Sequence, residues 1–278
     1  MTELEKQDIH GTDWDYLIVL DACRYDTFEE VYTEYLEGDL EKKKTRGTAT
    51  PEWLWNTFES SYDYTYISAI TYINNRGIDL QDKIGECPES WVPDEHFSKI
   101  IEAWDTEWNK ELDTVHPRDL TNLALKENDE KTIIHYVQPH RPYISADINK
   151  HTWWMKKELE NQDKSRKRQF FEKTRKLWKP IFTKMPSELQ KRTKNLLGVG
   201  NSFEELLKEV GEEKVKQYYR EDLELALKEI KRFVEEVDGK IIITADHGEL
   251  LGENGKWEHH IGGTEPQLTE VPWMEVKN

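Results

Sequence analysis

The sequence lacks the features typical of membrane-spanning proteins, disulfide-rich proteins and nucleic-acid-binding proteins. Two cysteines, Cys23 and Cys87, are too few for a disulfide framework. No run of about 18 apolar residues is present, so no membrane-spanning helix is expected. The first ten residues are acidic and polar, unlike a secretion signal. The expected location is therefore the reducing cytoplasm.

Basic residues are fewer than acidic ones. The sequence has 39 Lys and Arg and 56 Asp and Glu, which gives a net charge of −17. Attraction to nucleic acid is therefore not expected. One block departs from this balance, since residues 150–194 hold 15 Lys or Arg and 5 Asp or Glu. We expect a helical cap or insertion at about residues 150–200. It could be a solvated hairpin, a cover for an anionic substrate or a peripheral membrane contact.

Apolar runs that do not alternate with polar residues predict buried parallel strands. They cover residues 16–20, 132–137 and 240–244, with a weaker run at 64–70. Apolar residues at helical spacing predict a helix over 215–237. Strands that alternate with helices predict an α/β fold, with a mostly parallel central sheet and helices on both faces. We expect one such domain over residues 1–278, interrupted by the basic insertion.

Polar side chains follow three of these strands. Asp21 follows the first strand, His140 follows the middle one, and Asp246 and His247 follow the last. Ligands of such sheets bind beyond the carboxyl ends of the strands. If the strands are neighbours, these side chains share one rim, and their carboxylate and imidazole groups suit a divalent metal. The alternative for each residue alone is a helix cap or a polar turn.

Two threonines precede a predicted helix in "TRGTATPEWLWNTF". Pro51 suits the first position of a helix, which makes Thr50 the expected cap. Thr48 would lie just before the helix N-terminus, where free N–H groups favour an anion. A threonine hydroxyl held there beside a metal could become a nucleophile. Alternatively, both threonines only cap the helix.

Five segments, in this order, resemble the sulfatase-like branch of the alkaline phosphatase superfamily. They are "IVLDACRYDTF", "GTATPEWLWNTF", "VQPHRPY", "ITADHGELLGE" and "VPW", of which "ITADHGE" is the most specific. The resemblance covers roughly the first 75 and the last 65 residues and a short middle strand. It implies a metal-dependent enzyme with the α/β architecture described above.

The resemblance implies a metal site made of Asp21, Asp246 and His247, with Thr48 touching the metal. Sulfatases carry Cys or Ser in a C-x-P-S-R pattern, and alignment with it places Thr48 at the nucleophile. Thr50 then matches the proline and is the second choice. Because no cysteine or serine stands at the nucleophile, no formylglycine is expected, and a phosphate ester is the preferred substrate.

The resemblance also implies the residues that contact the substrate. His140 would contact the transferred group, and His259 would bind the substrate anion or a second metal and act in catalysis with His140. His260 is adjacent and could take the role of His259. Arg141 is the expected anion clamp, and Arg24 is a weaker candidate for the same role.

Together these features predict a hydrolase or transferase that acts on a phosphate monoester or diester through a threonine nucleophile. The expected cofactor is one Zn²⁺ or Mn²⁺ ion, with room for a second. A sulfate ester hydrolase and a non-catalytic binding domain derived from the superfamily are the alternatives. The substrate would be a small or polymer-linked anionic ester, and nucleic acid is not an expected partner.

Overall fold

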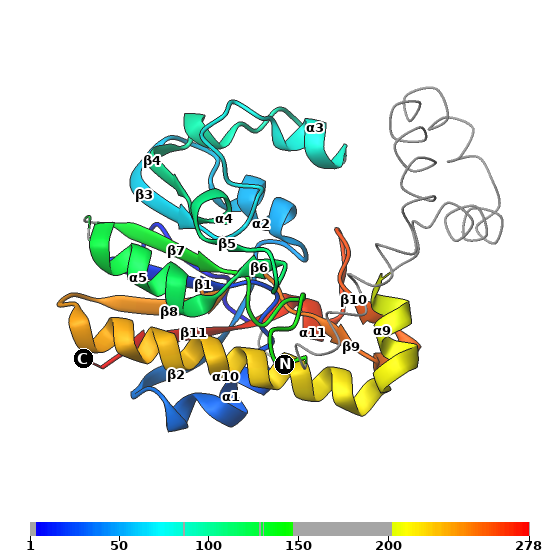
Figure 1. Cartoon of the computed structure of the whole chain (residues 1–278). Coiled ribbons are helices and arrows are strands. Elements are labelled where there is room, and N and C mark those ends of the chain that lie inside the picture. Colours follow the sequence, from blue (N-terminus) through cyan, green and yellow to red (C-terminus); the bar gives the residue numbers. More distant parts are fainter. Residues whose placement is uncertain (1–3, 86, 128, 130, 147–201, 278) are drawn as a thin grey trace. The chain divides into compact units, whose positions relative to one another are not determined.

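A computed structural model describes residues 4–85, 87–127, 129, 131–146 and 202–277 (Figure 1). The chain divides into two compact units, Met1–Ser145 with Lys216–Asn278, and Ala146–Val215. The basic block predicted at residues 150–194 lies outside the described residues, and so does the cap predicted at about residues 150–200. Among the described helices, none combines the length and the apolar character needed to cross a membrane.

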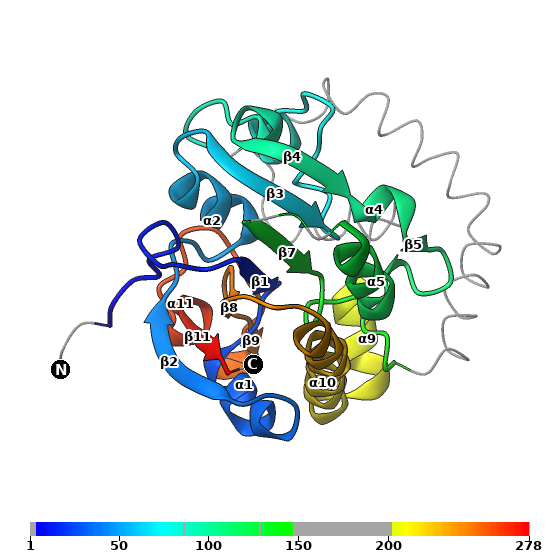
Figure 2. The same cartoon turned by 90° about the vertical axis from the view of Figure 1, so that its left-hand side faces the viewer.

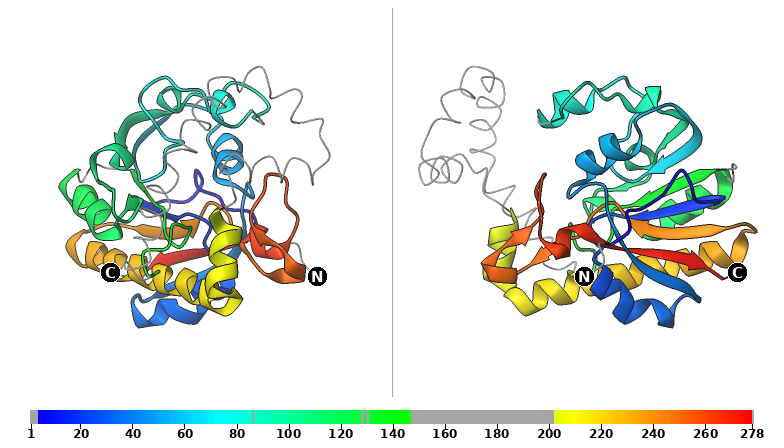
Figure 3. Two further views of the ribbon diagram at one scale, coloured as in Figure 1. Left: turned by 45° about the vertical axis from the view of Figure 1, so that its right-hand side comes forward. Right: turned by 180° about the vertical axis from the view of Figure 1, so that it is seen from behind.

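The first unit is built on a seven-stranded sheet with the strand order β2-β11-β8-β1-β7-β3-β4. Neighbouring strands from β8 to β4 are parallel, and β11 runs antiparallel to both β8 and β2 (Figure 3). The strands are β1 (Tyr16–Leu20), β2 (Gly38–Lys44), β3 (Tyr62–Ser68), β4 (Phe97–Glu102), β7 (Thr132–Tyr136), β8 (Ile241–Ala245) and β11 (Glu270–Val276). Two short ribbons pair β5 (Trp108–Asn109) with β6 (Thr114–Val115) and β9 (Leu250–Leu251) with β10 (Trp257–Glu258).

Helices cover both faces of the sheet (Figure 2). On one face the apolar sides of α1, α5 and α10 pack against Ile18, Ile134 and Ile243 of the central strands. On the other face Trp53 and Leu54 of α2 pack with Leu17 and Val19. The helices are α1 (Tyr25–Val31), α2 (Thr50–Thr57), α3 (Leu80–Ile84), α4 (Ala103–Thr106), α5 (Pro117–Glu127), α9 (Ser202–Val210), α10 (Glu212–Glu236) and α11 (Pro266–Thr269), with 3₁₀ turns at Tyr32–Glu34, Pro93–Glu95 and Glu253–Gly255.

The predicted fold class is confirmed. Strands β1, β7 and β8 are buried at every position, as their continuous apolar runs predict. The helix predicted over 215–237 is α10. The sequence did not predict β2, β4 or β11. Strand β2 is an edge strand that is mostly charged and has no fully buried position, and the short apolar run of β11 contains Pro272, which is uncommon inside a sheet.

Candidate active site

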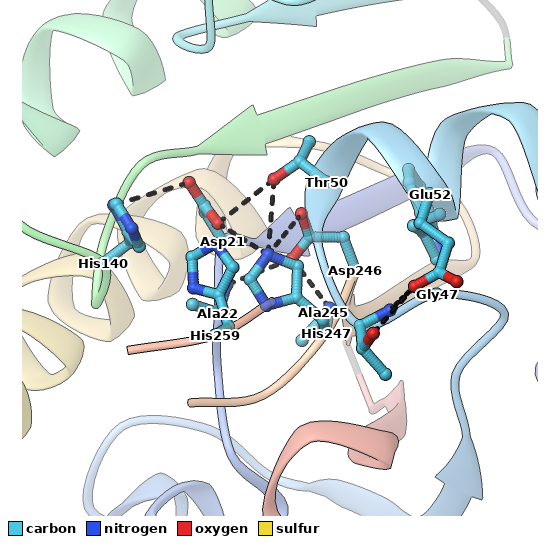
Figure 4. Close-up of polar contacts among 12 residues, drawn as sticks. Asp21, Ala22, Gly47, Thr50, Glu52, His140, Ala245, Asp246, His247 and His259 are labelled. Carbon is cyan, nitrogen blue, oxygen red and sulfur yellow. Dashed lines mark hydrogen bonds and ion pairs between the residues drawn. The ribbon is translucent and has the colours of Figure 1, made fainter. Parts of the chain in front are cut away.

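The carboxyl ends of the three central strands lie level with one another. Leu20 at the end of β1 pairs in register with Tyr136 at the end of β7 and with Ala245 at the end of β8. The next residue on β1 is Asp21 and the next on β8 is Asp246, so the two carboxylates reach the same rim. The structure therefore brings together the polar side chains that the sequence placed at separate strand ends (Figure 4).

An inner cluster consists of Asp21, Thr50, Asp246 and His247. The His247 Nε2 atom lies 3.4 Å from Asp21 Oδ1 and 3.5 Å from Asp246 Oδ2. The Thr50 hydroxyl lies 3.4 Å from both Asp21 Oδ1 and His247 Nε2. All four residues are buried, with at most 6% of any of them exposed.

Backbone groups fix the directions of the inner cluster. Asp246 Oδ1 accepts hydrogen bonds from the amides of Ala22 and His247, at 3.0 and 2.8 Å. Ala22 has a φ of 58°, a left-handed conformation that is costly for a residue with a side chain and is often found at functional sites. His247 Nδ1 lies 2.8 Å from the Gly248 carbonyl, which fixes Nδ1 as the donor and leaves Nε2 facing the two carboxylates.

The inner cluster is a set of tightly coupled charges. Burial, together with the nearby Asp246 charge, raises the pKa of Asp21 to about 6. Burial opposes the charging of Asp246 and of His247 as well, but here the mutual attraction wins. The pKa of Asp246 is lowered and the pKa of His247 is raised to about 9. At neutral pH the metal-free cluster therefore holds two carboxylates and one imidazolium, with a net negative charge.

One oxygen of the inner cluster has no hydrogen-bond partner among the described residues. This atom is Asp246 Oδ2, which is fully buried. An unpaired buried carboxylate oxygen is costly unless a cation or a donor satisfies it. The donor atoms of Asp21, Asp246 and His247 lie within 4.8 Å of one another. Two carboxylates and one imidazole form a donor set that suits zinc or manganese, so these residues fit a divalent metal.

The structure corrects the placement of the two threonines. Ala49 is the N-cap residue of α2, and Thr50 is the first helical residue, so Thr50 does not cap the helix. Its hydroxyl instead reaches the inner cluster. The Thr48 hydroxyl, which the sequence placed beside the metal, contacts Glu52 Oε2 at 2.7 Å and the His260 carbonyl at 2.8 Å. The second choice of the sequence is thus the threonine beside the carboxylates.

An outer cluster consists of His140, Glu249 and His259, whose donor atoms also lie within 4.8 Å of one another. His259 Nδ1 lies 3.2 Å from Glu249 Oε1, and the His259 ring centroid lies 4.2 Å from that of His247. His140 Nδ1 lies 3.9 Å from Asp21 Oδ2. The pKa of His140 is lowered well below its usual value by withdrawal from water and by the neighbouring His259 and Arg141.

The remaining predicted substrate residues lie at the edge of these clusters. Arg141 forms an ion pair with Glu258 and is about one-third exposed. His260 is exposed, and its backbone carbonyl faces Thr48. Arg24 is buried and pairs with Asp26 and Glu253. Its side chain also donates to the Glu249 carbonyl. Arg24 therefore connects α1 with the segment after β8.

Sequence reasoning missed Glu249, His135 and Tyr66. Glu249 stands three residues after Asp246 in the same strand-end segment, and that spacing was the available signal. His135 lies inside the buried strand β7, and nothing in the local sequence distinguishes it from a histidine of the core. Its Nε2 lies 3.7 Å from Asp246 Oδ2 and its Nδ1 lies 2.8 Å from the Tyr66 hydroxyl. Burial lowers the pKa of His135 to about 4, so its ring is neutral.

No protein-family model and no curated protein matches the sequence. Solved structures do resemble the fold. The C-terminal periplasmic domain of EcEptC from Escherichia coli is 12% identical, with a TM-score of 0.47 over 99% of this chain and 76% of that one. The corresponding domain of phosphoethanolamine transferase EptC from Campylobacter jejuni is 14% identical, with a TM-score of 0.42 over 94% of this chain and 77% of that one.

The integral membrane protein lipooligosaccharide phosphoethanolamine transferase A from Neisseria meningitidis is 12% identical, with a TM-score of 0.46. The match covers 98% of this chain and 49% of that protein, so the chain spans about half of its length. Another structure of the EcEptC domain is a complex with zinc. These likenesses concern the fold alone.

The cytoplasmic location predicted from the sequence is corrected by this comparison, because the similar structures are described as periplasmic domains or as part of an integral membrane protein. The prediction rested on the low cysteine count, on the lack of a long apolar run and on the acidic, polar first ten residues. These features describe composition, and none of them identifies a compartment.

Proposed function

We propose that this protein is a metal-dependent enzyme that transfers or hydrolyses a phosphate ester, with the Thr50 hydroxyl as its nucleophile. The observation that carries the proposal is the position of that hydroxyl. It lies 3.4 Å from an Asp21 oxygen and from His247 Nε2, at the mouth of a buried set of metal-ligand atoms. A threonine in such a place is more than a helix cap, since Ala49 holds the cap position.

In this proposal Asp21, Asp246 and His247 hold a zinc or manganese ion, with the Thr50 oxygen beside it. A divalent ion supplies Lewis acidity, which lowers the pKa of a nearby hydroxyl and polarises a phosphoryl oxygen. The charge balance supports this assignment, because two carboxylates face one imidazole and one buried carboxylate oxygen has no hydrogen-bond partner in the described part of the chain. The outer cluster offers three further donor atoms for a second, weaker ion.

The reaction would proceed in two displacement steps. The Thr50 oxygen attacks phosphorus, its proton passes to the adjacent Asp21 carboxylate, and the bond to the leaving alcohol breaks. Water or an acceptor alcohol then attacks phosphorus and gives its proton to His259, which lost one to the leaving alcohol, while the bond from phosphorus to the Thr50 oxygen breaks and Asp21 returns the proton to that oxygen. Hydrolysis and transfer therefore share the first step and differ only in the acceptor.

The outer cluster lies beside the inner one, since His140 Nδ1 is 3.9 Å from Asp21 Oδ2 and the His259 ring centroid is 4.2 Å from that of His247. His140 is neutral at pH 7, which suits a ligand or a hydrogen-bond partner for the phosphoryl group. This leaves His259, which contacts Glu249, as the group that protonates the leaving oxygen. The partial exposure of both rings, 23% for His140 and 21% for His259, gives a substrate access to them.

The test combines metal content, turnover and trapping of the intermediate. Purified protein should bind at least one equivalent of zinc or manganese and cleave a 4-nitrophenyl phosphate monoester or diester. Thr50→Val should keep the metal and lose at least about 1000-fold in kcat, while Thr50→Ser retains part of the activity. Mass spectrometry of a slow-substrate reaction should find the phosphoryl group on Thr50.

Three outcomes would reject parts of this proposal. Unchanged turnover in Thr50→Val would remove the nucleophile. Faster cleavage of 4-nitrophenyl sulfate than of either phosphate would assign a sulfate ester hydrolase. Metal and ester binding without turnover would assign a non-catalytic binding domain. An added acceptor alcohol that diverts product from phosphate to a new ester would identify the enzyme as a transferase.

A further inference from the structure

Thr48 connects the segment before α2 with the segment that carries His259. Its hydroxyl lies 2.8 Å from the His260 carbonyl and accepts a hydrogen bond from the Gly263 amide at 2.9 Å. The side chain is 4% exposed, so water does not replace these partners readily. Thr48 thus bridges two backbone groups on either side of the turn that follows His259.

Glu52 supports the same connection from the first turn of α2. Its Oε2 atom accepts from the Thr48 amide and the Thr48 hydroxyl, both at 2.7 Å, and from the Gly262 amide at 3.3 Å. A single carboxylate oxygen therefore binds groups from both segments. Because the hydroxyl has one proton, it donates either to Glu52 or to the His260 carbonyl, and both acceptors are within reach.

Gly47 allows this close approach. A Cβ atom at this position would lie 2.2 Å from the Trp53 nitrogen and 2.7 Å from the Glu52 carbonyl carbon. No side chain fits there, so the segment before Thr48 lies directly on the backbone of the first turn of α2. The glycine thereby brings the Thr48 amide within reach of Glu52. Gly47 and Glu52 lie side by side in the close-up (Figure 4).

The segment that carries His259 is also held on its other side. Glu258, the residue before His259, forms an ion pair with Arg141, which neighbours His140. His259 therefore lies between an anchor at Glu258 and an anchor at residues 260–263. The His259 ring has weaker restraints of its own, since its Nδ1 contacts with the two Glu249 oxygens measure 3.2 and 3.3 Å.

We infer that Thr48 and Glu52 are positioning residues that fix residues 259–263 against the first turn of α2. They thereby set the place of His259 relative to Thr50, the first residue of that helix. Neither residue touches the inner cluster in this arrangement, so each acts through His259. The catalytic part of the inference rests on the proposed function, whereas the anchoring part concerns the fold and can be tested without any activity.

The anchoring test measures hydrogen–deuterium exchange of the full chain with Thr48→Val, Thr48→Ser and Glu52→Gln. Valine keeps the shape of threonine but leaves the His260 carbonyl and the Gly263 amide without a partner. We expect exchange in residues 259–263 to rise about 10- to 100-fold. Thr48→Ser should restore most of the protection, Glu52→Gln should lie between the two, and α5 should be unchanged. Wild-type exchange rates in Thr48→Val would overturn the inference.

The catalytic test is a double-mutant cycle with His259→Ala. Thr48→Val should lower kcat/KM about tenfold with metal content unchanged, and the double variant should be no worse than His259→Ala alone. Additive losses would show that Thr48 acts independently of His259 and would overturn its positioning role. If the wild-type protein has no turnover at all, the proposed function fails, and hydrogen exchange still decides whether the anchor exists.

Discussion

The inner and outer clusters contain similar ligand atoms but lie in different surroundings. The inner cluster is buried and charged, and backbone amides that follow β1 and β8 fix its Asp246 carboxylate. The outer cluster is carried by segments beyond those ends, and about one-fifth of each histidine side chain is exposed. The comparison indicates that the inner residues are suited to hold a permanent ion, whereas the outer residues are suited to meet a substrate that enters and leaves.

The histidines of the two clusters also differ in protonation state. His247 of the inner cluster is held as an imidazolium by two carboxylates, and its pKa is about 9. His140 of the outer cluster has a pKa lowered well below its usual value. In the metal-free protein a proton on His247 therefore supplies part of the positive charge that an ion would otherwise bring to the inner cluster.

The largest effect is expected for Asp246→Asn, which breaks the inner cluster alone. The amide keeps an oxygen for the Ala22 and His247 amides but loses the negative charge. Removal of one partner from a buried charged set costs about 3–5 kcal/mol, or roughly 10²- to 10⁴-fold in metal affinity. Metal content and kcat/KM should fall together. Asp13→Asn, at a position where the side chain is 74% exposed, is the matched control, and wild-type metal content in Asp246→Asn would contradict the assignment.

An effect of similar size, but on turnover and not on metal binding, is expected for His259→Ala, which alters the outer cluster alone. Loss of a proton donor costs roughly 10²- to 10⁴-fold in kcat. The tightly bound metal of the inner cluster should stay in place, because Asp21, Asp246 and His247 are unchanged. Metal analysis and steady-state kinetics check this result. Loss of the tightly bound ion in His259→Ala would mean that the two clusters form one site.

The two clusters should also differ in their response to pH. Since the pKa of His247 is about 9, metal binding to the inner cluster must displace a proton at neutral pH. Metal affinity should rise about tenfold per pH unit between roughly pH 6.5 and 9. Competition with a chelator at several pH values measures this slope. The slope should persist in His140→Ala, and a pH-independent affinity would contradict the protonated state of His247.

The same pairing affects the stability of the metal-free protein. The pKa of His247 is raised from 6.5 to about 9 in the folded state. Its contribution to stability is therefore fully present below about pH 6.5 and is lost as the pH rises towards 9. Urea unfolding of the metal-free protein across this range should show the decrease, and a saturating metal concentration should remove it.

The smallest effect is expected for Tyr66→Phe, which lies behind the inner cluster. Its hydroxyl is 2.8 Å from His135 Nδ1, and the opposite ring nitrogen faces Asp246 Oδ2 at 3.7 Å. Loss of this hydrogen bond should cost about 1 kcal/mol of stability. Loss of an outer-shell contact of this kind should weaken metal binding by about tenfold. Tyr62→Phe, at a half-buried position of the same strand, is the control, and equal metal affinities in the two variants would contradict a supporting role for His135.

Much of the fold and of the inner cluster was predictable from the sequence. The apolar runs of β1, β7 and β8 are buried on both faces, so they carry a signal that does not depend on their neighbours. The less regular elements were not predictable. Strands β2 and β11 pair with each other, and β11 also pairs with β8. The sequence of β2 is mostly charged, and the short apolar run of β11 is interrupted by Pro272.

The amino-acid sequence by itself determined that Asp21, His140, Asp246 and His247 follow strand ends, because the order of strand and polar residue is local to each segment. The tertiary structure decided which threonine joins them. Thr48 and Thr50 are two residues apart, and the start of α2 at Thr50 turns their hydroxyls towards different partners. The tertiary structure also brought His135 and Tyr66 to the site. Their positions depend on the packing of segments distant in sequence, which no local pattern records.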